Sequence, residues 1–231
     1  MKINDIDISS FKAKQLSVDI QPSEKDVEAE WFTQSLSPLI LKENRGFKKV
    51  DVEIYFKGES KSNVSMMISN FISKFSKLNK LNLDGYPTIF YGILRDKSIS
   101  KINSFASILT INLDAIECGT EIVESFNNIA TKVINVKGND ITPAIVEITP
   151  TAEMIDFIIE GLSDEPIKLK DLVGSKTFIL DGEKEKATVD GVNSFKQTDM
   201  WEFPRLKPGS TTIKVSRTNC TVKIKYKPRY N

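Results

Sequence analysis

Residues 199–209 run Asp-Met-Trp-Glu-Phe-Pro-Arg-Leu-Lys-Pro-Gly, an aromatic-rich connection that ends in a turn pair. Large apolar side chains in a connection usually enter a core, so we interpret Trp201 as a core residue whose indole N–H needs a partner. The Pro208-Gly209 turn then restarts a strand. An alternative interpretation uses the apolar ring face of Trp201 to stack against a sugar.

Short strand-like segments surround this stretch on both sides. They are Thr131–Val136, Ala144–Thr149, Ile155–Glu160, Ile167–Leu169, Thr177–Leu180, Ala187–Val189, Thr211–Val215 and Thr221–Tyr226. Turn pairs such as Asp181-Gly182 and Asp190-Gly191 separate them, and a glycine there supplies the positive φ of a hairpin turn. A Ca²⁺ loop would need oxygen ligands at further fixed positions, which are missing. The regular spacing predicts a β-sandwich of about a hundred residues.

Helix patterns are confined to the first half. Apolar residues recur at three- and four-residue steps in one stripe, which predicts an amphipathic helix with Ser62 as its N-cap: Val64, Met67, Ile68, Phe71, Ile72, Phe75 and Leu78. We expect this stripe to lie on a sheet. A second helix is predicted over Asp26–Leu36, opened by residues 22–24, because Val27, Trp31, Phe32 and Leu36 also recur at helical spacing.

Alternating apolar residues predict strands in the same half at Val50–Phe56, Ile89–Leu94 and Phe105–Ile116. The pattern changes near Asn128. We therefore expect an α+β domain over residues 1–128 and an all-β domain over residues 129–231.

Composition excludes several classes of function. The chain has 231 residues, 32 basic and 31 acidic, for a net charge of +1. Such a charge would not steer the protein to nucleic acid or an anionic membrane. It has no histidine, which removes His-dependent triads and imidazole metal ligands. The two cysteines, Cys118 and Cys220, have no metal-ligand spacing, and we expect ordinary thiols half-buried in strands. No secretory signal or membrane span is indicated.

The last strand carries an uneven charge. Lys223, Lys225 and Lys227 alternate with apolar residues and so share one strand face. A nucleic-acid groove would place aromatics on that face, whereas Tyr226 points the other way. We interpret the lysines as protection of an edge strand. Docking onto an acidic partner subunit is the alternative.

Three runs in the second half resemble a known family. They are residues 179–183 (Ile-Leu-Asp-Gly-Glu), 188–193 (Thr-Val-Asp-Gly-Val-Asn) and 201–209 (Trp-Glu-Phe-Pro-Arg-Leu-Lys-Pro-Gly). Together they resemble the C-terminal domain of phage distal tail proteins, the Dit family of long-tailed phages and prophages of Gram-positive bacteria. Residues 138–150 look like the opening of that domain. The residues that carry the resemblance are Asp181, Gly182, Asp190, Gly191, Trp201, Phe203, Pro204, Pro208 and Gly209.

The resemblance is weaker across residues 3–20, 50–56 and 83–86, but it spans nearly the whole chain. It implies an N-terminal belt domain that assembles into a ring, typically of six copies, and a peripheral galectin-like sandwich. The ring is expected at the distal end of a virion tail, made in the host cytoplasm. There it would join the tail tube to tail-tip, tail-associated lysin or baseplate proteins. No catalytic residue, cofactor or metal is implied.

Other functions stay open at this point. A carbohydrate-binding module could attach the tail to the host cell wall through Trp201, although galectins use a histidine that this chain lacks. An enzyme built on carboxylates would need a deep pocket lined by acidic residues with perturbed pKa values. The tail-tube protein itself, or the hub of a contractile particle, is a structural alternative.

Overall fold

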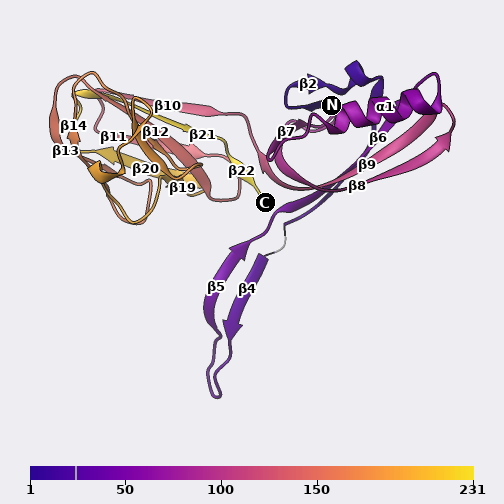
Figure 1. The fold of residues 1–231 in the computed structure, drawn as a ribbon. Coiled ribbons are helices and arrows are strands. Elements are labelled where there is room, and N and C mark those ends of the chain that lie inside the picture. Colours follow the sequence, from indigo (N-terminus) through magenta and orange to yellow (C-terminus); the bar gives the residue numbers. More distant parts are fainter. Residues whose placement is uncertain (24) are drawn as a thin grey trace. The chain divides into compact units, whose positions relative to one another are not determined.

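The chain folds into two compact units that are mostly β-structure (Figure 1). The computed structural model describes residues 1–23 and 25–231, and the side chains of these except residues 25, 26 and 43–45. The first unit is Met1–Cys118 with Asn231, and the second is Gly119–Tyr230. Strand β10 (Ile122–Asn127) pairs with β21 (Cys220–Tyr226), which places it in the second unit rather than before a division at residue 128.

The first unit is built on one antiparallel sheet. Its strand order is β2-β1-β7-β8-β9-β6-β3. The bounds are β1 Lys2–Ile3, β2 Ile6–Asp7, β3 Ala13–Gln21, β6 Lys48–Lys57, β7 Asn79–Asn82, β8 Ile89–Asn103 and β9 Ala106–Cys118, with a 3₁₀ turn, η1, at Ile8–Phe11. The predicted strands at residues 50–56, 89–94 and 105–116 are confirmed, and β8 continues well beyond its predicted end.

Helix α1 (Lys61–Ile72) confirms the stronger helix prediction. Its N-cap is Ser60, not Ser62, because the Asn63 amide donates to Ser60 Oγ at 3.2 Å. The buried face joins the core of the sheet through Phe71, whose ring meets those of Phe11, Phe56 and Phe75 edge-on at 5.5–5.6 Å. Among the described residues, no helix is long and apolar enough to cross a bilayer.

The second predicted helix is wrong. Strand β4 (Lys25–Glu30) pairs with β5 (Leu39–Arg45) in a separate two-stranded sheet, the β4–β5 hairpin (Figure 1). The apolar residues that suggested a helix are exposed on this hairpin and its connection. A helical stripe stabilises a helix only where it is buried, and here the described part of the chain leaves these side chains exposed. Glu24, at the predicted start of the helix, lies outside the described residues.

The second unit is a sandwich of two antiparallel sheets. One has the order β10-β21-β12-β15-β16-β17, with β19 also pairing with β12; the other has the order β11-β20-β13-β14-β18. The remaining bounds are β11 Thr131–Val136, β12 Thr142–Pro150, β13 Met154–Glu160, β14 Ile167–Leu172, β15 Phe178–Asp181, β16 Lys186–Val189, β17 Val192–Asn193, η2 Phe195–Gln197, β18 Thr198–Asp199, β19 Arg205–Leu206, β20 Gly209–Val215 and β22 Arg229–Tyr230. Side chains from both sheets form one core, as predicted, among them Val146 and Phe157.

The lysine-rich strand is central in its sheet, so the edge-strand interpretation is wrong. Strand β21 lies between β10 and β12. Two of the lysines pair with carboxylates of neighbouring segments: Lys225 Nζ lies 2.6 Å from Glu147 Oε1, and Lys227 Nζ, just after the strand, lies 3.5 Å from Glu183 Oε1. The central position of β21 results from its pairing with β10, about a hundred residues earlier in the chain. The local sequence of β21 could not indicate that pairing.

Candidate functional site

The aromatic residues of the connection at residues 199–209 do not behave alike. Trp201 is 90% exposed, so its interpretation as a core residue is wrong. The chain buries Pro204 and Leu206 instead. Phe203 is partly buried, with its ring 6.0 Å from that of Phe195. The connection is therefore anchored by its second half and presents an indole to solvent at its start.

Two of the sequence runs that carry the family resemblance meet at one backbone junction. The Ala144 amide donates to the Pro204 carbonyl at 2.9 Å, and the Gly182 amide donates to the Ala144 carbonyl at 3.0 Å. A Cβ on Gly182 would stand 2.2 Å from the Pro204 oxygen. Close backbone approach, rather than the positive φ expected from the sequence, therefore requires glycine at this position.

The two Asp-Gly pairs form different turns. Asp181 Oδ1 accepts hydrogen bonds from the amides of Glu183 (3.0 Å) and Lys184 (2.9 Å), which closes the β15–β16 turn. Asp190 and Gly191 form the two-residue turn between β16 and β17, with φ values of 50° and 79°. That turn has the positive φ at both positions that the sequence predicts for a tight hairpin. Among the described residues, no group of acidic or cysteine side chains could hold a metal ion.

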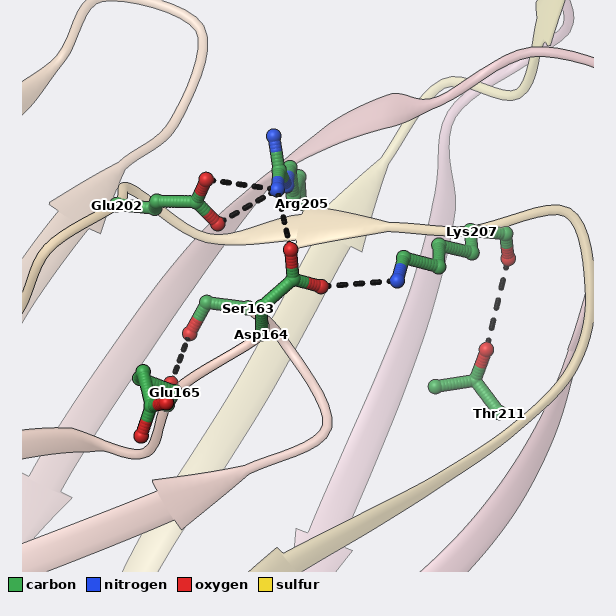
Figure 2. Close-up of polar contacts among 7 residues, drawn as sticks. All are labelled: Ser163, Asp164, Glu165, Glu202, Arg205, Lys207 and Thr211. Carbon is green, nitrogen blue, oxygen red and sulfur yellow. Dashed lines mark hydrogen bonds and ion pairs between the residues drawn. The ribbon is translucent and has the colours of Figure 1, made fainter. Parts of the chain in front are cut away.

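A cluster of charged side chains borders the connection (Figure 2). Arg205 Nη2 lies 2.6 Å from Glu202 Oε2 and 3.1 Å from Asp164 Oδ2. Lys207 Nζ lies 2.8 Å from Asp164 Oδ1. The Arg205 amide donates to the Leu162 carbonyl at 2.7 Å. These contacts hold the β13–β14 loop against β19 and the residue that follows it, Lys207.

The electrostatics of this cluster suit a structural contact. The Lys207 ammonium, through its hydrogen bond and charge, lowers the pKa of Asp164 below its usual value, and Arg205 adds to the effect. An acid that is ionised at neutral pH cannot donate a proton, so Asp164 is a poor general acid. Elsewhere in the unit, burial raises the pKa of the Cys220 thiol and of Tyr226, which disfavours reactive anions at both.

The junction lies within the part of the chain that matches a known protein family. Residues 137–230 match the family described as siphovirus-type tail component, C-terminal domain. The resemblance to phage distal tail proteins is confirmed. No curated protein matches the chain at the sequence level.

Solved structures extend the likeness to both units of this Dit-like chain. The crystal structure of phage SPP1 Dit, described as a paradigm of hub adsorption apparatus in phages infecting Gram-positive bacteria, is 11% identical with a TM-score of 0.76, covering 99% of this chain and 98% of that one. Two structures of the activated phage P2 baseplate, with Ca and with Sr, are 10% and 12% identical with TM-scores of 0.56 and 0.52. They cover 96% and 95% of this chain and 92% of each neighbour. At these identities the likeness is one of fold.

The sequence indicates the connection and its turns, but not the charged cluster or the β4–β5 hairpin. Asp164 and Arg205 are about 40 residues apart in the chain, and only the β12–β19 pairing and the β13–β14 loop bring them together. No local motif marks such a pair. The hairpin did leave signals: Trp31 and Phe32 were assigned to a helix, and the apolar run Leu39–Leu41 was assigned to no element.

Proposed function

We propose that this Dit-like chain is a structural hub protein of a phage or prophage tail. Six copies form a closed ring that connects the tail tube to tail-tip, tail-associated lysin or baseplate proteins. One observation carries the proposal: the fold of both units follows SPP1 Dit over nearly the full length of both chains. The family match in the second unit independently supports it.

Within this proposal the first unit (Met1–Cys118) is the belt of the ring, and the galectin-like second unit (Gly119–Tyr230) lies at its periphery. A ring repeats one heterologous contact and closes on itself, so every copy is held on two sides. A persistent contact of this kind buries about 1,000 Å² or more. The net charge of +1 keeps repulsion between copies low.

The proposed role is mechanical: it uses no cofactor, metal or catalytic residue, and it places the protein at the distal end of the virion tail. What supports it is the character of the charged cluster. Its carboxylates form ion pairs with neighbouring arginine and lysine side chains, and Asp164 stays ionised. Such a cluster fixes loops and transfers no protons.

Native mass spectrometry of the purified full chain, with negative-stain images of the same sample, tests this function. We expect a discrete ring, six times the mass of one chain, with a central opening. A strict monomer at the highest soluble concentration, with no rings on the grid, would contradict the proposal.

A second candidate is favoured by one observation, the 90% exposure of Trp201. An exposed indole offers a flat apolar face on which a sugar ring can stack, so the sandwich could bind cell-wall glycan. Pulldown with host cell walls, comparing the unaltered chain with Trp201→Ala, tests it. Binding that disappears in a folded variant would support the candidate, and no binding by the unaltered chain would remove it.

A further inference from the structure

The β4–β5 hairpin exposes an unusual amount of apolar surface. Trp31 and Phe32, directly after β4, are 69% and 57% exposed. Three consecutive residues of β5, Leu39–Leu41, are each about half exposed or more, and Leu36 between the strands is fully exposed. Consecutive exposed apolar residues are a defect in a monomer unless they serve a contact.

The hairpin also lacks the support that a two-stranded sheet needs. Strands β4 and β5 pair with each other and, among the described residues, with no further strand. None of the hairpin's side chains belongs to either hydrophobic core of the described chain. An isolated hairpin is marginally stable in water, and three strands or a packing partner are usually required. A contact with another molecule would supply that support.

The first unit offers a complementary acceptor at the far end of β8. Helix α1 and β8 border a cavity of about 440 Å³ lined by Val64 and Ile68 of the helix and by Ile99 and Ile102 of the strand. Ile99 and Ile102 are each more than half exposed. Strand β7 pairs with β8 only as far as Gly92, so within the described residues the rest of β8 has β9 on one side and an open edge on the other. Open edges accept strands from other chains.

The two surfaces carry mainly opposite charges, with Lys42 opposite Glu28 in the hairpin and Asp96 before Lys97 in β8 as the exceptions nearest the proposed contact. Strand β4 carries Glu28 and Glu30, both exposed. The far half of β8 carries Lys97 and Lys101, also exposed, and Lys101 lines the cavity together with Lys61. Opposite charges around an apolar contact select the partner and its orientation more than they add affinity.

We propose that the β4–β5 hairpin of one copy docks into the α1–β8 cavity of the next copy. Trp31 and Phe32 enter the apolar cavity, and Glu28 and Glu30 face Lys97 and Lys101. Because donor and acceptor are different surfaces, the contact is head-to-tail and can repeat around a closed ring. This inference rests on the proposed ring and names the surfaces that build it.

Paired variants of the full chain test the contact. The hairpin variant is Trp31→Asp with Phe32→Asp, and the acceptor variant is Ile99→Asp with Ile102→Asp. A control, Trp201→Asp with Val192→Asp, removes two apolar residues of the second unit that are at least as exposed. We expect the hairpin and acceptor variants each to weaken self-association at least about 100-fold in light scattering and native mass spectrometry, and the control to assemble like the unaltered chain. Circular dichroism checks that every variant is folded.

Mixing the two variants gives a sharper result. Each retains one intact surface, so a head-to-tail contact predicts that the mixture forms dimers containing one copy of each and nothing larger. A charge exchange covers the case in which an aspartate in the cavity prevents folding. Glu28→Lys with Glu30→Lys should weaken assembly, and adding Lys97→Glu with Lys101→Glu in the same chain should restore it.

Three results separate the inference from the proposed function. Loss of assembly in either variant, with mixed dimers or charge rescue, supports the contact. Assembly of the unaltered chain that persists in both variants overturns the contact and leaves the ring in place. A monomeric unaltered chain overturns the ring and the contact together.

Discussion

Strands β12 and β8 are both long and both lie in antiparallel sheets, but their side chains meet different surroundings. Along β12 every residue is buried or half-buried, because the second sheet of the sandwich covers one face. Along β8 only Phe90 and Gly92 are buried, and the residues after Leu94 are all exposed. The second unit covers its core with its own two sheets, whereas the first unit leaves apolar side chains of β8 exposed.

The two units differ in whether their own residues supply all the layers that their cores need. A sandwich supplies both layers of its own core, so its stability is set by internal packing. The sheet of the first unit has helix α1 over part of one face, and the far end of β8 is left exposed together with the hairpin. We interpret that leftover surface as the place where assembly supplies the missing layer.

The largest effects should come from the two cores themselves. Phe71→Ala and Phe157→Ala each remove a ring that is almost fully buried and should cost about 3–5 kcal/mol of unfolding free energy. Phe71 should fall at the upper end because three edge-on ring contacts are lost with it. Cys118 and Cys220 are buried in different units, so thiol labelling in a denaturant series assigns each loss to its unit. Equal exposure of both thiols in both variants would show that the units unfold as one.

A smaller effect distinguishes two glycines of the sandwich. Gly182→Ala places a Cβ 2.2 Å from the Pro204 oxygen and 2.7 Å from the Ala144 oxygen, so the junction must open, at a cost of about 1–3 kcal/mol. Gly191→Ala meets no atom within 4 Å and loses only the ease of positive φ, about 1 kcal/mol. Urea denaturation of both variants measures the difference. A larger loss for Gly191→Ala would contradict the importance of the junction.

The charged cluster should contribute a modest, pH-dependent term. A lowered pKa in the folded state means that ionised Asp164 stabilises the fold at neutral pH, and that this stabilisation is lost as pH falls through the lowered value. Asp164→Asn should therefore melt earlier than the unaltered chain at pH 7, and the gap should close on acidification below pH 3.8, the ordinary value. Melting temperatures across that range test it, and a gap that widens in acid would refute it.

The smallest effect on stability is expected at the most conspicuous side chain. Trp201→Ala removes an indole that is 90% exposed, so the unfolding free energy should change by no more than about 0.5 kcal/mol. Thermal denaturation measures this directly. A loss of 2 kcal/mol or more would mean that the indole packs against the sandwich.

Elements that bury one face could be predicted from the sequence. The apolar stripe of α1 and the alternation of β6 report local periodicity and burial together. The strand was found at nearly its observed bounds, whereas the predicted stripe runs on to Leu78, beyond the end of the helix at Ile72. The short strands of the sandwich were equally visible because turns with Gly, Asp and Pro separate them.

Features that depend on the surroundings of a segment could not be predicted. Val27, Trp31 and Leu36 fit a helix by spacing alone, and nothing local says that the chain offers them no surface to bury against. Trp201 is a large aromatic residue of the kind that usually enters a core, and yet it is exposed. The lysines of β21 look like edge protection, but β10, far away in the sequence, covers that edge. Of the candidate site, the turns were predicted and the ion pairs that join distant loops were not.

The register of β3 against β6 gives the hairpin a particular place in the chain. Gln21 at the end of β3 lies directly opposite Lys49 near the start of β6, so the polypeptide leaves the sheet and re-enters it at the same point. Residues 22–47 could accordingly be shortened, exchanged or grafted while the hydrogen-bond ladder on either side stays as it is. An engineer could use the same position to display a foreign peptide, and the proposed contact between copies would then be lost while the sheet is kept.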